Sequence, residues 1–131
     1  MVQIPVEMMT EFVTLNHGNG GRLTHNLIEQ VFVKLFGMSL PLTDSAIIAR
    51  TDSALAYTTD SYVIDPLFFP GGNIGKLAVC GTINDLAVSG ARPVALSLSL
   101  IIEEGFAFDL LEKILDSIAK TAAQNNAPVA G

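Results

Sequence analysis

The chain has 131 residues, of which 50% are hydrophobic and 15% charged, and its formal net charge is −6. This length allows one domain with a substantial core but is short for two, and the composition argues against long disordered stretches. Acidic residues outnumber basic ones by 13 to 7, and no stretch concentrates Lys or Arg, which argues against a nucleic-acid partner.

The amino-terminal half of the chain predicts one helix and two short strands. Residues 1–10 show no clear period and are expected to be a leader or a frayed terminus. Apolar residues recur at helical spacing over residues 22–36, and Gly37 follows as a stop signal. Residues 46–49 and 55–64 are rich in strand formers and are separated by a turn-prone stretch, so they could pair as a hairpin.

The middle of the chain predicts an apolar loop and then a buried helix. Residues 65–73 combine two prolines, two glycines and two phenylalanines, which is typical of a loop that docks on another surface. Residues 74–89 have helical spacing but are apolar almost all round, so the helix is expected to be buried. Cys80 lies within it and is interpreted as a small core residue rather than a nucleophile.

The last third of the chain predicts a strand and an amphipathic helix. Residues 94–102 alternate with the two-residue period of a strand that has unequal faces. Asp109 can cap a helix. Its buried stripe would be Leu110, Leu111, Ile114, Leu115, Ile118 and Ala122. A further strand is expected near Pro128, and because the sequence stops soon afterwards, at Gly131, we expect a piece of a longer protein.

Cysteine usage and hydropathy predict the compartment. A single cysteine cannot build a disulfide framework or a cysteine-based zinc site, which favours a reducing compartment. The sequence shows neither the pattern of a secretory leader nor the ~18 consecutive apolar residues of a membrane span. We therefore expect a soluble, cytoplasmic protein. The low charged fraction leaves an apolar surface, which indicates an interface with a second domain or a second copy.

A glycine-rich loop before the first predicted helix is a candidate anion site. After His17 come Gly18, Asn19, Gly20 and Gly21, which together form the glycine loop. Backbone amides of such a loop can converge on a phosphate group, helped by the start of the following helix. The spacing is not that of a Walker loop, so a flexible entry loop is an equally good interpretation.

Three aspartates lie at the ends of predicted elements and could converge on a divalent cation. Asp44 precedes the first predicted strand, and Asp60 follows two threonines, although both could be turn residues. Asp85 follows Asn84 inside the apolar helix, where a charge needs a partner, which favours a metal or ligand contact over a structural hydrogen bond. Lys76, at the start of the same helix, could meet a phosphate, a carboxylate or only solvent.

These residues lie within a longer resemblance. The run at residues 58–87, TTDSYVIDPLFFPGGNIGKLAVCGTINDLA, closely resembles the signature block of the HypE family of hydrogenase maturation proteins. That family is part of the aminoimidazole-ribonucleotide-synthetase (PurM-like) superfamily. The segments HGNGG at residues 17–21 and IEEG at residues 102–105 resemble it too, so the likeness covers nearly everything after Met9.

The resemblance implies an ATP-binding domain with Mg²⁺ at an acidic site. The magnesium contacts that it implies are Asp44, Asp60 and Asp85. The catalytic residues that it implies are Asp60, Lys76 and Asp85. The nucleotide contacts that it implies are His17, Gly18, Asn19, Gly20, Gly21 and Asn84.

The activity implied by the resemblance is an ATP-dependent dehydration. ATP would activate the oxygen of a carboxamide carried on a carboxy-terminal cysteine, and loss of phosphate would leave a thiocyanate whose cyanide passes to hydrogenase iron. The carboxy-terminal domain of the family and the Gly-Asp motif that Gly131 would begin are absent, so this chain alone is expected to be inactive. The implied partners are a second copy and other maturation proteins, namely a carbamoyltransferase and iron-scaffold proteins.

The predicted fold class is α/β (α+β), with a mixed β-sheet covered by helices on one face, over residues 11–131. The resemblance implies the PurM amino-terminal architecture, with the open sheet face pairing in a homodimer. Two alternatives for the function stay open. One is another ATP-dependent kinase or synthetase of the same superfamily, and the other is a non-catalytic module for dimerisation and partner docking.

Overall fold

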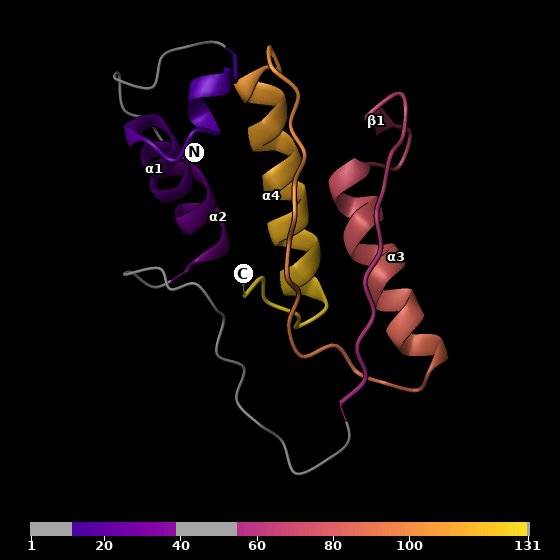
Figure 1. Ribbon diagram of the computed structural model, residues 1–131. Helices are drawn as coiled ribbons and strands as arrows, with labels where there is room; N and C mark the ends of the chain where they lie inside the picture. The colour runs from indigo at the N-terminus through magenta and orange to yellow at the C-terminus, as the bar shows by residue number, and fades with distance from the viewer. Residues whose placement is uncertain (1–11, 39–54, 131) are drawn as a thin grey trace.

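The computed structural model describes residues 12–38 and 55–130, which are drawn in colour in Figure 1. The elements in these residues are η2 (Leu15–His17, a 3₁₀ helix), α1 (Arg22–Leu27), η3 (Ile28–Val33, a π-helix), α2 (Lys34–Phe36), β1 (Phe68–Phe69), β2 (Gly72–Asn73), α3 (Ile74–Val88) and α4 (Phe108–Gln124). The predictions for residues 1–10, for a strand at residues 46–49 and for Asp44 lie outside the described residues.

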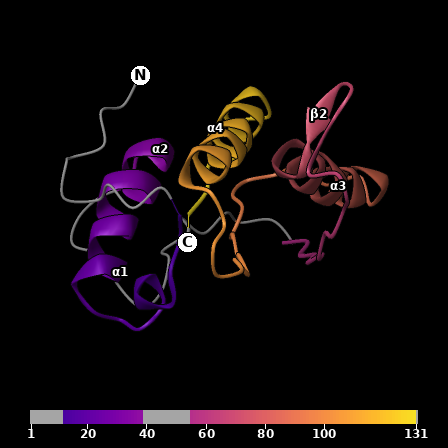
Figure 2. The same ribbon diagram turned by 90° about the horizontal axis from the view of Figure 1, so that it is seen from above.

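The helices lie side by side in one layer. α4 lies in the middle, with α1 and α2 on one side of it and α3 on the other (Figures 1 and 2). The extended segments at residues 55–65 and 94–102 run across the same face of this layer, over α3 and α4 respectively. Helices thus cover one side of the extended chain, and the predicted α/β class is confirmed.

The first helix extends over the predicted range. α1, η3 and α2 follow one another without a break from Arg22 to Phe36, with the π-helical turns of η3 in the middle. Gly37 then adopts a φ of 63°, in the left-handed region that glycine enters without a steric penalty, and ends the helix as predicted. Leu27 and Val31 point from this helix into the core.

α4 carries the centre of the core. Its buried side chains recur at three- and four-residue spacing and include Leu115, with no exposed surface, and Ile118, which is 2% exposed. The predicted stripe is therefore confirmed except at Leu110, which is only half-buried. The predicted cap is wrong, because the helix begins at Phe108 after Ala107, and Asp109 lies in the first turn. Its carboxylate accepts from Lys113 Nζ at 2.9 Å instead.

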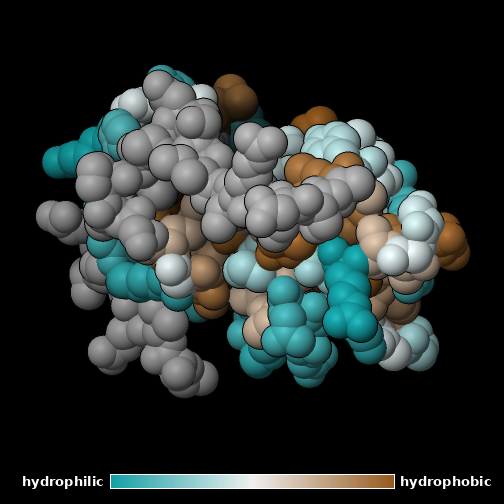
Figure 3. Space-filling view, turned by 90° about the horizontal axis from the view of Figure 1, so that it is seen from below, coloured by the Kyte–Doolittle hydropathy of each residue, from teal (hydrophilic) through white to brown (hydrophobic). Residues whose placement is uncertain are grey.

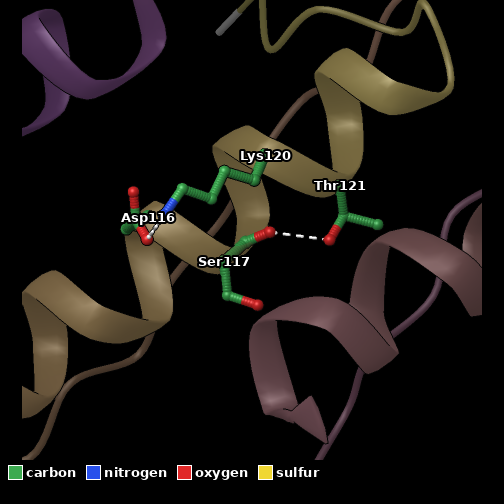
Figure 4. A network of polar contacts seen from close by, with 4 residues as sticks. All are labelled: Asp116, Ser117, Lys120 and Thr121. Atoms are coloured by element: carbon green, nitrogen blue, oxygen red, sulfur yellow. Dashed lines mark hydrogen bonds and ion pairs between the residues drawn. The ribbon is translucent and has the colours of Figure 1, made fainter. Parts of the chain in front are cut away.

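Polar side chains of α4 bond to partners one turn away on the same helix, and one of them, Thr121, is itself buried (Figure 4). Lys120 Nζ lies 2.7 Å from Asp116 Oδ2, one turn away on the same helix. Thr121 Oγ1 donates to the Ser117 carbonyl at 2.7 Å. These contacts stay within the helix, so they stabilise it locally, while the apolar stripe fixes its place in the fold.

α3 packs on α4 through its amino-terminal half. Asn73 caps the helix, its Oδ1 accepting from Lys76 N at 3.1 Å. Gly75 lies so close to α4 that a Cβ there would stand 2.6 Å from the Ile114 carbonyl oxygen. The prediction of burial all round is wrong, since Val88 is 87% exposed. α3 lies at the edge of the helix layer, so among the described residues only one flank of it is covered by another helix (Figure 2).

The described residues contain β-pairing in both directions, but little of it. β1 and β2 form a short antiparallel hairpin inside the predicted loop at residues 65–73. Leu96 forms a parallel bridge with Val129, close to where a strand was predicted to begin. In that bridge Leu96 N donates to the Pro128 carbonyl at 2.9 Å, and Ala130 N donates to the Leu96 carbonyl at 2.8 Å.

The predicted strand at residues 94–102 is extended, but the described part of the chain gives it only that one bridge. Its faces are unequal, as the alternation predicts. Leu98 and Ile102 pack against the core, whereas Ile101 is fully exposed. Residues 55–64 are also extended and unpaired among the described residues. A hydrogen-bonded ladder needs a neighbouring strand, which side-chain alternation alone does not guarantee.

Large apolar side chains reach the surface on both extended segments. Tyr57 is 81% exposed and Val63 97% exposed on the first, and Ile101 is fully exposed on the second. Figure 3, seen from below, shows hydrophobic residues at the surface beside strongly polar ones. None of the helices in the described residues is long and apolar enough to cross a membrane.

Candidate functional site

Asp60 and Asp85 meet although they come from different elements. Asp60 lies on the extended segment at residues 55–65, and Asp85 lies near the end of α3, over which that segment runs (Figure 1). The two carboxyl groups are near enough for Asp60 to shift the pKa of Asp85 upward. The sequence interpretation required two separated carboxylates to converge, and in this pair they do.

The contact changes the titration of one partner. A hydrogen bond with Asp60 raises the pKa of Asp85 above its ordinary value of 3.8, and partial desolvation and repulsion from the Asp60 charge act in the same direction. Two like charges this close disfavour each other, so one proton is held between them more tightly than by a lone carboxylate. A cation placed between them would remove this repulsion.

Tyr62 holds Asp60 in place against α3. Its hydroxyl donates to Asp60 Oδ2 at 2.9 Å, and the Thr82 side chain lies near enough to the same hydroxyl to affect its pKa. The ring lies over Gly81, where a Cβ would stand 2.7 Å from the Tyr62 Cζ atom. Burial, followed by the neighbouring carboxyl groups and opposed by Thr82, raises the pKa of Tyr62. The phenol is therefore protonated at neutral pH and can serve as a donor.

The pair is exposed rather than buried. Asn84, Asp85 and Asp60 all lie at the surface of the described chain. The prediction that Asp85 sits inside a buried helix is therefore wrong, because the flank of α3 that carries Asp85 faces away from α4. What distinguishes Asp85 is its acidic neighbour, and its side chain is free to reach a ligand that approaches from solvent.

The donor set fits a hard divalent cation with a small number of protein ligands. Among the described residues no three His, Cys, Asp or Glu side chains are placed to hold a metal ion, so this pair is one ligand short of such a cluster. Asp44, the third predicted ligand, is not among the described residues. Mg²⁺ commonly uses one or two carboxylates and takes its remaining oxygens from water and phosphate, which two exposed aspartates allow.

The glycine loop is ordered by its own side chains. Gly20 N donates to Thr24 Oγ1 at 3.0 Å, and Gly21 N donates to Asn19 Oδ1 at 2.9 Å. Gly20 has a φ of 77°, which a residue with a side chain rarely adopts. These amides thus point at oxygen acceptors that lie at the surface, the kind of partner that an anion also provides.

His17 differs from the rest of the predicted nucleotide contacts. Its ring is only 3% exposed, and Nδ1 accepts from Thr14 N at 3.0 Å. It lines a cavity of about 240 Å³ together with Leu27, Leu100 and other side chains, most of them apolar. The expectation that His17 itself touches a nucleotide disagrees with this burial, because the ring faces the core beside α4.

Lys76 does not lie beside the acidic pair. Its Nζ donates to the Gly71 carbonyl at 2.9 Å, in the turn between β1 and β2. Lys76 and Asp85 are nine positions apart on α3, which corresponds to about 13 Å along a helix axis. The glycine loop is also separate, since it precedes α1, on the other side of α4 from α3 (Figures 1 and 2).

Sequence reasoning missed Tyr62, Gly81 and Thr82, although simple spacing contained the signal. Tyr62 follows Asp60 by two positions, which puts both side chains on one face of an extended segment. Gly81 precedes Asp85 by four positions, which puts both on one face of a helix. The aromatic ring beside Asp60 can therefore pack on the part of the helix surface that the glycine near Asp85 leaves open.

Comparisons with known proteins agree with this arrangement of elements. Residues 42–131 match the family described as AIR synthase related protein, N-terminal domain. The chain is 52% identical over 117 residues to carbamoyl dehydratase HypE of Rhodobacter capsulatus, covering 86% of this chain and 34% of that protein. It is 49% identical over 118 residues to carbamoyl dehydratase HypE of Escherichia coli, covering 84% of this chain and 35% of that protein.

A solved structure gives the same likeness in three dimensions. The crystal structure of hydrogenase maturation protein HypE in complex with ATP superposes with a TM-score of 0.85 at 44% identity, over 89% of this chain and 35% of that one. The chain therefore spans about a third of the length of the relatives that it matches.

Proposed function

Because the chain belongs to the family of AIR synthase related proteins, through their N-terminal domain, we propose that it is the ATP-binding part of a carbamoyl dehydratase of the HypE type. In the full-length protein this domain would support dehydration of an S-carboxamide on a carboxy-terminal cysteine to a thiocyanate, the source of hydrogenase cyanide ligands. The observation that carries the proposal is the meeting of Asp60 and Asp85 at the surface of α3.

The chemistry asked of these residues is binding and charge control. Asp60 and Asp85 would hold Mg²⁺, with Asn84 beside them at the same exposed end of α3. When bound, Mg²⁺ supplies neutralisation of phosphate charge. Tyr62 keeps the Asp60 carboxylate turned toward Asp85 through its 2.9 Å hydrogen bond. This bond limits the rearrangement that Asp60 needs to receive the ion, which lowers the cost of binding it.

The glycine loop would contribute backbone donors to the nucleotide. In the free chain the Gly20 and Gly21 amides donate to Thr24 and Asn19, and phosphate oxygens would replace these neutral acceptors. Because the loop and the acidic pair lie on different sides of α4, they would engage one nucleotide only with further protein completing the site. The unmatched two thirds of the relatives, or a second copy, can supply it.

We propose a homodimer as the assembly. The extended segments lie on the face that the helices leave open (Figure 1), and Tyr57, Val63 and Ile101 on these segments are exposed. Pairing of two such faces would bury them and suits the obligate, apolar kind of interface. Further partners would be the other hydrogenase maturation proteins, a carbamoyltransferase and iron-scaffold proteins, in the cytoplasm.

Mass spectrometry of the full-length protein tests the function directly. Protein carrying a carboxamide on its terminal cysteine, incubated with ATP and Mg²⁺, should lose the mass of one water from that cysteine's peptide. An Asp60→Asn, Asp85→Asn double variant should not lose this water. Asp109→Asn changes an exposed aspartate on α4 and should react like the wild-type protein.

The same incubation and an assay in cells separate the alternatives. Phosphate appearing on an added small molecule, with no water lost from the cysteine, would favour a kinase or synthetase. Full hydrogenase maturation in cells that carry the double variant would favour a docking module without catalysis.

A further inference from the structure

His17 is the residue that connects the glycine loop to the core. It is the last residue of η2, and Gly18 follows it directly. Its ring is 97% buried, in contrast to Gly18, Asn19 and Gly20, which are all exposed. A buried side chain immediately before an exposed loop fixes where that loop begins.

The hydrogen bonds of the ring define its role. Nδ1 accepts from Thr14 N at 3.0 Å, and the Thr14 hydroxyl oxygen lies 2.9 Å from the same nitrogen. Because a backbone N–H is always a donor, Nδ1 must be unprotonated, and the neutral ring carries its hydrogen on Nε2. Within the described residues Nε2 is buried without a hydrogen-bond partner.

An apolar ring would avoid this unsatisfied nitrogen. Phenylalanine would fill most of the same space and leave no orphaned N–H, so packing alone does not account for a histidine here. What phenylalanine cannot do is accept from the Thr14 amide. The acceptor at Nδ1 is therefore the property of His17 that the fold uses.

The segment that ends at His17 is hydrogen bonded to the turn before α4. Val13 N donates to the Phe106 carbonyl at 2.7 Å, and Gly105 N donates to the Val13 carbonyl at 2.7 Å. The His17 ring packs on Phe108 in a T-shaped arrangement, with centroids 5.1 Å apart. The glycine loop thus begins at a point fixed to α4 and ends at the first turn of α1.

We infer that His17 is a positioning residue, which accepts from Thr14 N so that the glycine loop begins in the geometry that presents its amides to a nucleotide. The nucleotide as the ligand of the loop rests on the proposed function. The effect of His17 on the geometry of the loop does not. His17 itself makes no contact with the ligand. It acts by lowering the conformational cost that the loop would otherwise incur on binding.

Two substitutions in the full-length protein separate the role of His17 as a hydrogen-bond acceptor from the packing of its ring. His17→Asn keeps an acceptor, Oδ1, at the same number of bonds from the backbone as Nδ1, but loses ring volume. His17→Phe keeps the volume and loses the acceptor. Calorimetric titration with ATP and Mg²⁺ gives the affinity, thermal unfolding gives the stability, and amide hydrogen exchange of residues 18–21 reports the loop.

The two variants are expected to fail in opposite ways. His17→Phe loses the hydrogen bond from Thr14 N but also removes the unpartnered Nε2–H, and these opposing effects should leave its unfolding temperature near that of the wild-type protein. It should exchange faster at residues 18–21 and bind ATP about tenfold more weakly, the size of one lost local hydrogen bond. His17→Asn should unfold at a lower temperature and bind ATP within about twofold of the unmodified protein.

Several results would overturn the inference. It fails if His17→Phe binds ATP normally, if exchange at residues 18–21 is unchanged in that variant, or if His17→Asn loses as much affinity as His17→Phe. If the unmodified full-length protein binds no ATP, the proposed function fails. The exchange comparison then decides the positioning role alone, since faster exchange in His17→Phe supports it and equal exchange refutes it.

Discussion

The Tyr62 ring lies against Gly81 of α3 so closely that a Cβ at residue 81 would stand 2.7 Å from Cζ. This contact brings the extended segment onto the helix and sets Asp60 beside Asp85. A helix interior ordinarily gains from alanine in place of glycine. At this position the gain in helix propensity conflicts with the geometry of the site.

Gly81→Ala is expected to damage the site more than the fold. The tyrosine ring can swing aside, so unfolding free energy should change by less than about 1 kcal/mol, while the Tyr62 contact with Asp60 is lost. Gly75→Ala is the matched control, because its Cβ would meet the Ile114 carbonyl of α4, which cannot move away. That variant should lose about 1–3 kcal/mol. Denaturant unfolding and ATP–Mg²⁺ titration of both variants test the contrast.

Removing the Asp60 charge should lower the pKa of Asp85. Asp60→Asn takes away the acidic neighbour, so the pKa of Asp85 is expected to return toward 3.8. Added Mg²⁺ should lower it in the unmodified protein, since a cation favours the carboxylate. Carboxyl carbon NMR titration measures both shifts. An Asp85 pKa that is the same with and without the Asp60 carboxylate would show that the two groups do not interact.

The raised pKa also predicts the sign of a pH dependence. Folded Asp85 keeps its proton to higher pH than the unfolded chain does, so its contribution favours the fold below pH 3.8 and is lost as pH rises through the raised pKa. Asp85→Asn should remove this decline. Denaturant unfolding at a series of pH values across that range measures the slope of the unfolding free energy against pH, which should differ between the two proteins. Asp116→Asn, on α4, is the control.

Core and surface positions should respond very differently to truncation. Leu115 has no exposed surface and packs at the centre of α4, so Leu115→Ala should cost about 2–5 kcal/mol. Val63 is 97% exposed, so in the monomer Val63→Ala should stay within about 0.5 kcal/mol. Urea unfolding at low protein concentration measures both. Equal losses would contradict the placement of the core around α4.

The exposed apolar face predicts an effect on assembly. Changing Val63 and Ile101 together to lysine places two charges on the proposed dimer face and should convert a dimer of the full-length protein to a monomer. Val88→Lys is the control, because Val88 is 87% exposed but lies at the end of α3 rather than on an extended segment. Sedimentation equilibrium should show a monomer for the double variant and a dimer for both the wild-type protein and Val88→Lys.

Helices were predictable because each one carries its own signals. Residues 22–36 have an apolar stripe and a glycine stop, and α4 buries the stripe that its spacing indicates. Its first residue was placed too late, since Asp109 resembles a cap but pairs with Lys113 instead. Local periodicity thus gives the existence of a helix more reliably than its boundary.

Neither burial nor site geometry could be read from local pattern. The apolar surface of α3 suggested burial all round, but α3 lies at the edge of the layer, and Asp85 is exposed. The resemblance implied that Lys76 acts with Asp60 and Asp85 and that His17 contacts the nucleotide, whereas Lys76 bonds to the hairpin turn and His17 faces the core. The exposure of α3 and the burial of His17 depend on tertiary packing between segments that are far apart in the sequence, which no single window of residues contains. The Lys76 contact is local, but side-chain spacing alone does not predict it.

The central claim is that Asp60 and Asp85 act together on one Mg²⁺ ion at bound ATP. Calorimetric titration of ATP into the full-length protein, with and without Mg²⁺, tests it most directly, with Asp60→Asn, Asp85→Asn and the double variant beside Asp109→Asn. The account predicts that the Mg²⁺-dependent part of the affinity falls in each single variant and falls little further in the double variant, while Asp109→Asn retains it. Mg²⁺-dependent ATP binding of normal strength in the double variant would contradict the account.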